Sequence, residues 1–322
     1  MLDFLKKIFG NKSDKDVKEL LPIIEEINEY FEEYNKLTDE EVQAKTLYFK
    51  GIINDAAHKL EEEKTSMEEK LKSPDFLVEL ESLHADLQVV VAFRMLPEVV
   101  WKMPSLGTFN LHASLLPQYR GAAPINHAII NGMKTTGVTT FFLDEKIDTG
   151  KIMYRESIEI EDHDNAGSLH DKLMIMGAEL VKKTVDDIAI GNFQTTSQQS
   201  YLQNDEKLLE APKIFKEFCK IDWNNSVVEL NNFIRGLSPY PTAYTTIHNH
   251  DSKAFLLKIF KTKMDKTSPL SGLPGAIKTD NKKILSFECT DGFLIIEELQ
   301  LEGKKRMTTE EFLKGFRLNE TK

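Results

Sequence analysis

Cysteine is scarce in this chain of 322 residues, which contains only Cys219 and Cys289. Two thiols are too few for a disulfide framework or a thiolate zinc site, so we expect a reducing compartment and no metal. No apolar run approaches the roughly 20 residues that a membrane helix needs, and the charged N-terminus does not resemble a signal peptide. We therefore expect a cytoplasmic protein without membrane insertion, and we take it to be a monomer.

Glycine is rare at the beginning, where residues 1–70 contain only Gly10 and Gly51. Apolar side chains recur there at helical spacing, and Thr38 can cap a helix, with Glu41 completing a capping box. A nucleotide-binding loop of the Gly-x-x-x-x-Gly-Lys type is absent from the sequence. Residues 1–70 are predicted to form a helical segment that packs on its own domain or touches a membrane surface.

Charge is distributed unevenly along this acidic chain, whose formal net charge is −11. Residues 252–283 hold eight lysines against Asp265 and Asp280. A local excess of positive charge attracts phosphate, although a solvated lysine-rich face has the same composition. The charge pattern alone leaves both interpretations open.

The pattern of residues 71–190 changes to alternating strands and helices. Residues 87–93 form a β-branched run typical of a strand buried on both faces, and 109–112 and 137–143 are further strands. Helices are predicted over 75–83, 123–131 and 167–190. The alternation predicts an α/β layer over residues 71–190.

The remainder of the chain has a different organisation. Residues 191–207 include the polar stretch 194–200 and are predicted to be a linker. Within 208–322, short apolar runs are separated by turn residues, which is typical of a small β-barrel. These runs cover residues 254–260, 275–279, 284–289 and 293–301.

Polar side chains follow two of the predicted strands. Asn110 and His112 are two residues apart on one strand, so they point to the same side of the sheet, and Asp148 follows the next strand. Acyl transfer to an amine needs an oxyanion donor, a base and a carboxylate beside that base, which these residues can supply in that order. By spacing alone, a buried histidine with a structural hydrogen bond is the better interpretation of His112.

The string from Phe109 to Ile125, together with 148–150, closely resembles the formyltransferases that use 10-formyltetrahydrofolate. Arg120 to Ile125 is similar to the methionyl-tRNA branch, and the likeness covers about residues 70–322. It implies a Rossmann-like sheet, an OB-like C-terminal barrel that binds tRNA, and catalytic roles for Asn110, His112 and Asp148. It further implies folate binding by Ser114, Leu115, Leu116 and Pro117, and tRNA binding by Arg120, Lys253, Lys258, Lys261, Lys263, Lys304, Lys305 and Arg306.

The likeness stops before the first 65–70 residues, which instead resemble the start of the translocase motor ATPase SecA. The opening strand and the basic glycine-rich loop of the formyltransferases do not occur there. We therefore expect a truncated sheet with an exposed hydrophobic edge, and strongly reduced or absent activity.

The expected function is formyl transfer from 10-formyltetrahydrofolate to the amine of methionyl initiator tRNA, without a metal. Two alternatives remain open at this point: a tRNA-binding fusion protein without catalysis, and a formyltransferase that acts on sugar nucleotides.

Overall fold

The computed structural model describes residues 38, 69–92, 95–202, 207–249 and 251–318. The chain divides into two compact units, Met1–Ser73 and Pro74–Lys322. The predicted helical segment 1–70 and its likeness to SecA lie outside the described residues, apart from Thr38 and the last two positions. Among the described helices, none combines the length and hydropathy of a membrane span.

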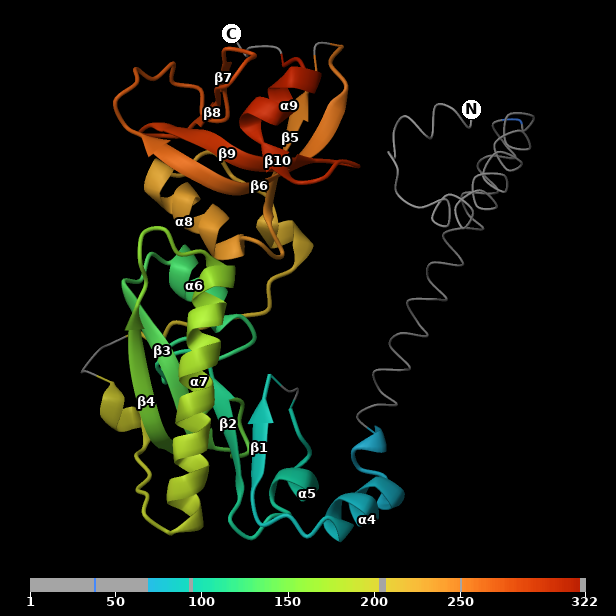
Figure 1. The fold of residues 1–322 in the computed structure, drawn as a ribbon, viewed down its shortest axis with the longest axis vertical. Helices are drawn as coiled ribbons and strands as arrows, with labels where there is room; N and C mark the ends of the chain where they lie inside the picture. The colour runs from blue at the N-terminus through green and yellow to red at the C-terminus, as the bar shows by residue number, and fades with distance from the viewer. Residues whose placement is uncertain (1–37, 39–68, 93–94, 203–206, 250, 319–322) are drawn as a thin grey trace. The chain divides into compact units, whose positions relative to one another are not determined.

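The first half of Pro74–Lys322 is an α/β layer with four strands in the order β1 to β4 (Figure 1). The strands are β1 (Gln88–Val91), β2 (Thr108–His112), β3 (Thr135–Phe142) and β4 (Ile152–Glu159). The sheet is mixed, because β1 pairs with β2 in parallel whereas the β2–β3 and β3–β4 pairs are antiparallel. The helices are α4 (Pro74–Ser82), α5 (Glu98–Trp101), α6 (Pro124–Ile130) and α7 (Ala166–Ala189).

The predicted burial of the first strand on both faces is wrong. Val89 and Val91 on β1 are 43% and 55% exposed. The physical reason is position, since β1 is an edge of the described sheet and alternates partly buried and exposed residues along its length. In the described part of the chain, β2 is the one strand that pairs with β1.

Helix α7 lies across the sheet formed by β2, β3 and β4 (Figure 1). Asn165 starts it with a capping box, in which its side chain accepts from the amide of Ser168. The buried face of α7 has helical periodicity, and its apolar members are Ala166, Leu169, Leu173, Leu180 and Ile188. The helix predicted over 167–190 is therefore confirmed, and it closes the core on one side of the sheet.

The described residues 191–202 have more structure than a polar linker suggests. Thr196 exchanges two backbone hydrogen bonds with Ile152 at the start of β4, of 2.8 and 2.9 Å. A 3-10 helix, η1 (Gln198–Tyr201), follows. Further along, Glu210 forms a parallel β-bridge with Arg120. The connecting segment is thus attached to the α/β layer at two places.

The C-terminal part is a curled antiparallel sheet in the order β5-β6-β9-β8-β7, with β10 on β9. Three of its four predicted strands are nearly exact, whereas β6 is longer than expected and β5 was not predicted. Its elements are η2 (Lys216–Cys219), α8 (Val227–Leu237), β5 (Ala243–His248), β6 (Ala254–Asp265), β7 (Ile277–Thr279), β8 (Leu285–Glu288), β9 (Phe293–Leu301), β10 (Met307–Thr308) and α9 (Thr309–Gly315).

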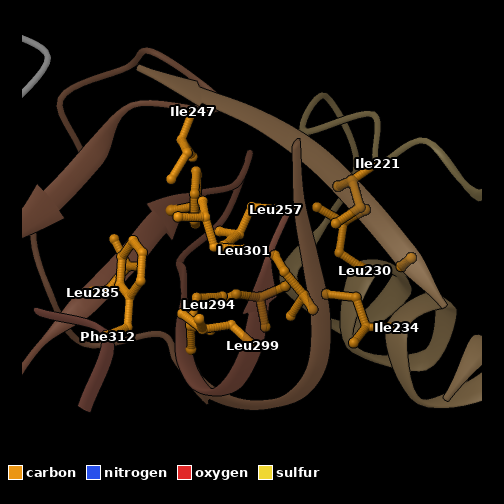
Figure 2. Close-up of a cluster of buried hydrophobic side chains, with 14 of the residues drawn as sticks. Ile221, Leu230, Ile234, Ile247, Leu257, Leu285, Leu294, Leu299, Leu301 and Phe312 are labelled. Carbon is orange, nitrogen blue, oxygen red and sulfur yellow. The ribbon is translucent and has the colours of Figure 1, made fainter. Parts of the chain in front are cut away.

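The strands of this sheet and the helices α8 and α9 share one hydrophobic core. Figure 2 shows side chains from α8, such as Leu230 and Ile234, packing toward those of the strands, such as Leu257 and Leu299. All four are at most 3% exposed. Helix α9 adds Phe312 to the same core. The architecture agrees with the predicted fold class, an α/β domain followed by a small barrel.

Candidate active site

The carboxyl end of β2 opens into a cavity of 940 Å³. Asn110, His112 and Asp148 all line it, so the three residues singled out from the sequence border one cavity. Most of the other lining groups are apolar. They include Val90, Leu96, Trp101, Leu143 and Val181. The volume and chemistry suit a ligand of drug size, since such pockets are mainly apolar with a few placed polar groups.

His112 is 6% exposed, and its two ring nitrogens have different surroundings. Nε2 lies 2.8 Å from the carbonyl oxygen of Tyr119. A carbonyl only accepts, so Nε2 carries a proton and donates it. In the neutral ring Nδ1 is then without a proton, and it faces Asp148 Oδ2 at 3.8 Å. Nδ1 is therefore the atom of His112 that can accept a proton.

Asp148 has a backbone φ of +55°, which is unusual for a residue with a side chain. Its Oδ2 accepts a hydrogen bond of 2.9 Å from the amide of Gly121. Gly121 itself has a φ of +121°, and a Cβ there would lie 2.5 Å from the carbonyl oxygen of Ala211. The turn after β2 thus requires glycine, and this glycine fixes the carboxylate.

Asn110 brings a side-chain amide to the same cavity. Its Oδ1 is buried and has no hydrogen-bond partner among the described residues. Leaving a buried polar atom unpaired costs about 1–3 kcal/mol, so such an atom points to a ligand group that completes it. The amide and the apolar walls fit an acyl donor of the size of a folate.

Thr139 on β3 holds the turn that joins β2 to Tyr119. Thr139 Oγ1 donates to the carbonyl of Ser114 at 2.6 Å and accepts from the amide of Leu116 at 3.2 Å. Ser114 and Leu116 are fully buried, and none of the residues predicted to bind folate, Ser114, Leu115, Leu116 and Pro117, is among those that line the cavity. In this structure they shape the turn that directs the Tyr119 carbonyl to His112.

Arg120 lies apart from the other predicted tRNA-binding residues. Its Nε and Nη2 donate to Gln198 Oε1 at 3.1 and 2.6 Å. Gln198 was missed by the sequence analysis, because it lies in a polar stretch whose composition gives no sign of a buried partner. Gly121 was part of the recognised string, but its amide contact with Asp148 could not be inferred from spacing.

The other predicted tRNA-binding residues gather on neighbouring parts of the C-terminal sheet, around β6 and the β9–β10 turn. Two of them are paired with acids: Lys261 Nζ lies 3.0 Å from Glu297, and Arg306 Nε donates to Glu298 at 2.7 Å. Those without an ion pair to a described residue are Lys253, Lys258, Lys263, Lys304 and Lys305. The cluster therefore keeps a net positive field.

Burial also shifts the pKa values of two groups near the site, Tyr119 and His127. The pKa of the Tyr119 phenol is raised by burial, so this hydroxyl stays protonated at neutral pH, and it accepts a hydrogen bond of 3.3 Å from Asn131. The pKa of His127 is lowered by burial, and its Nε2 donates to the carbonyl of Pro212 at 3.0 Å. Neither group lies free to act as a base.

Comparison with known families gives two matches. Residues 41–185 match the formyl transferase family and 213–317 match the formyl transferase C-terminal domain. The first match begins at residue 41, so the expectation that the likeness to formyltransferases starts near residue 70 is wrong, and residues 186–212 fall between the two matches.

Curated relatives are similar over most of their length. The methionyl-tRNA formyltransferase of Azobacteroides pseudotrichonymphae genomovar. CFP2 is 57% identical over 246 residues, 76% of each chain. That of Parabacteroides distasonis is 54% identical over 77% of this chain and 76% of its own.

Solved structures share the fold at low identity. HypX from Aquifex aeolicus in complex with tetrahydrofolic acid superposes with a TM-score of 0.55 at 21% identity, over 77% of this chain and 42% of that one. The sugar 3N-formyl transferase WlaRD gives a TM-score of 0.50 at 21% identity, over 70% and 77%.

Proposed function

The chain belongs to the methionyl-tRNA formyltransferase family, and we propose that it transfers a formyl group from 10-formyltetrahydrofolate to the amino group of methionyl initiator tRNA. The observation that carries the proposal is the convergence of Asn110, His112 and Asp148 on one largely apolar cavity. This arrangement supplies the groups that acyl transfer needs, and the folate is a co-substrate that leaves as tetrahydrofolate.

The reaction begins when the amine of the methionyl group attacks the formyl carbon and forms a carbon–nitrogen bond. Negative charge develops on the formyl oxygen, where the amide of Asn110 can donate a hydrogen bond. Nδ1 of His112 takes the proton that the amine loses, because Nε2 already donates to Tyr119. Asp148, 3.8 Å from Nδ1, stabilises the imidazolium.

The intermediate then collapses as the bond between the formyl carbon and N10 breaks. The electron pair stays on N10, and the proton held by His112 returns to that nitrogen. The products are formylmethionyl tRNA and tetrahydrofolate, and His112 is neutral again. No metal takes part in this scheme.

The residues proposed to hold the tRNA are those of the C-terminal cluster, with Lys258 and Lys263 as its central members on β6. Phosphate contacts of this kind give affinity without reading sequence. Arg120 is the least suited of the predicted contacts, because two of its donors are engaged by Gln198.

Turnover is proposed to be slow. Val90 and Val91 belong both to the cavity wall and to β1, the edge strand of the described sheet. An edge strand with an exposed apolar face is held less firmly than a central one, so this part of the wall is weakly supported. A turnover rate equal to that of the relatives would contradict this part of the proposal.

The likeness of the first 65–70 residues to SecA remains a proposal about a segment outside the described residues, and the formyl transferase match from residue 41 opposes it over the later part of that segment. A cytoplasmic location and a monomeric state are proposed as well. Both described cysteines are buried thiols, and a reducing compartment suits them.

The acceptor is tested with radiolabelled formyl donor and two candidate amines, methionyl initiator tRNA and a dTDP-amino sugar. Label is expected only on the tRNA, and only when it is charged, because uncharged tRNA offers no free α-amine. Label on the amino sugar would replace the proposed acceptor. Binding of tRNA with no label on either would favour a tRNA-binding protein without catalysis.

A further inference from the structure

Gln198 connects the segment that follows α7 to the loop that carries Asp148 and Gly150. It is the first residue of η1 and is 4% exposed, although its neighbours in sequence are polar and solvated. It lies in the stretch 186–212 that neither family match covers. A glutamine so buried needs partners for its donor and its acceptor, and both sets are present.

Nε2 of Gln198 donates to two carbonyl oxygens of the loop that carries Asp148. The distances are 2.8 Å to the carbonyl of Asp148 and 2.9 Å to that of Gly150. These bonds act on the backbone of the very residue whose φ is +55°. A left-handed conformation at a residue with a side chain persists only when its surroundings hold it in place.

The orientation of the Gln198 amide is set by Arg120. A guanidinium has donors only, so the Gln198 atom that accepts hydrogen bonds from Nε and Nη2 of Arg120 must be the oxygen Oε1. The nitrogen of the amide is thereby turned toward the two loop carbonyls. The chain of contacts from Arg120 through Gln198 to Asp148 therefore has one self-consistent hydrogen-bond pattern.

We propose that Gln198, oriented by Arg120, is a positioning residue that holds the Asp148 carboxylate against Nδ1 of His112. This role rests on the proposed formyl transfer, and it extends the site to a residue of the segment that follows α7. Asp148 is then held from both sides, by the Gly121 amide at its carboxylate and by Gln198 at its backbone.

The decisive variant is Gln198→Glu, which keeps the size and the acceptor for Arg120. Its second oxygen faces the carbonyls of Asp148 and Gly150 and cannot donate to them, so the loop should move away. Since small displacements of catalytic groups have large effects, kcat should fall roughly tenfold or more. KM for the tRNA should stay within about twofold, because no tRNA contact changes.

Two further variants complete the comparison. Gln198→Asn keeps a donor and an acceptor on a shorter side chain and should retain more activity than Gln198→Glu. Gln199→Ala removes an exposed neighbour on the same 3-10 helix and should behave as wild type. All three should fold, because the backbone bonds between Thr196 and Ile152 anchor the segment independently of residue 198.

A second measurement separates this role from the proposed reaction. The Gly121 amide is protected by the Asp148 carboxylate, so its hydrogen exchange should accelerate in Gln198→Glu and stay unchanged in Gln199→Ala. Slow exchange and a normal kcat in Gln198→Glu would overturn the positioning role. An inactive wild type would defeat the proposed reaction, and the exchange rates would still decide whether Gln198 holds Asp148.

Discussion

At the scale of single residues, the site depends on two residues whose backbone φ is positive, a conformation that residues other than glycine rarely adopt. Tyr119 has a φ of +61° and Asp148 one of +55°. The first turns a carbonyl toward His112 Nε2, and the second brings a carboxylate to within 3.8 Å of Nδ1. Because both residues are bound by neighbours, the strain is a means of placing the groups that react.

Asp280 allows a test at the residue scale that is independent of catalysis. Its Oδ1 accepts from the amides of Lys282, Lys283 and Ile284, each at 2.8 Å, which lowers the pKa of the carboxyl to about 2. A lowered pKa means that the charged form stabilises the fold above the unfolded-state pKa of about 3.9 and that this gain disappears as the pH falls toward 2.

Asp280→Asn removes this charge and keeps an acceptor of nearly the same shape. We expect the variant to be less stable than wild type in urea titrations at pH values above about 4, and the difference to shrink on acidification. Asp251→Asn, an exposed carboxylate in another loop, is the control. A difference that is constant across this range would contradict the assigned cause.

At the scale of elements, the sequence predicted the helices and strands whose apolar residues form a clear pattern. Helix α7 was found almost to the residue because its buried positions recur at helical spacing, and strand β9 because an apolar run there directly follows the turn residues Asp291 and Gly292. Strand β4 was not found, since Ile152 to Glu159 becomes half exposed after its first residues and loses an apolar alternation. The prediction that β1 is buried on both faces was wrong, because the burial of a strand depends on which strands and helices lie beside it, and the strand's own sequence does not contain that information.

The edge strand gives the element-scale prediction. Val89 on β1 is 43% exposed and does not line the cavity. A lysine there should discourage edge-to-edge association, so Val89→Lys should reduce light scattering at high protein concentration. Val78→Lys, on the 66% exposed position of helix α4, is the matched control and should have less effect. Equal effects would mean that net charge, and not the edge, governs association.

At the scale of the whole molecule, the α/β layer and the C-terminal sheet pack closely within Pro74–Lys322. Asn126 on α6 donates to the carbonyl of Gly236 on α8 at 2.7 Å, and a Cβ at Gly236 would lie 2.6 Å from Ile130. Such an interface fixes the lysine cluster relative to the cavity. The sequence predicted the fold class of both parts and singled out three residues that meet at one cavity, but it did not predict this packing, which depends on contacts far apart along the chain.

Affinity for tRNA tests the lysine cluster. Lys258→Ala and Lys263→Ala should each weaken binding and reduce the slope of log affinity against log salt by about 1, since each lysine displaces a counterion. Lys182→Ala on α7, whose lysine is paired with Asp186 at 2.6 Å, is the control and should leave the slope unchanged. Filter binding over a salt series measures it, and equal slopes in all variants would place the tRNA elsewhere.

The central claim is tested most directly by single-turnover formylation of methionyl initiator tRNA with saturating 10-formyltetrahydrofolate, comparing the full chain with His112→Ala and with His163→Ala. His163 is a histidine whose side chain is 78% exposed, so its loss should not matter. The account predicts slow formylation by wild type and by His163→Ala, and a loss of at least about a hundredfold in His112→Ala, as for a missing general base. Equal rates for wild type and His112→Ala would contradict it.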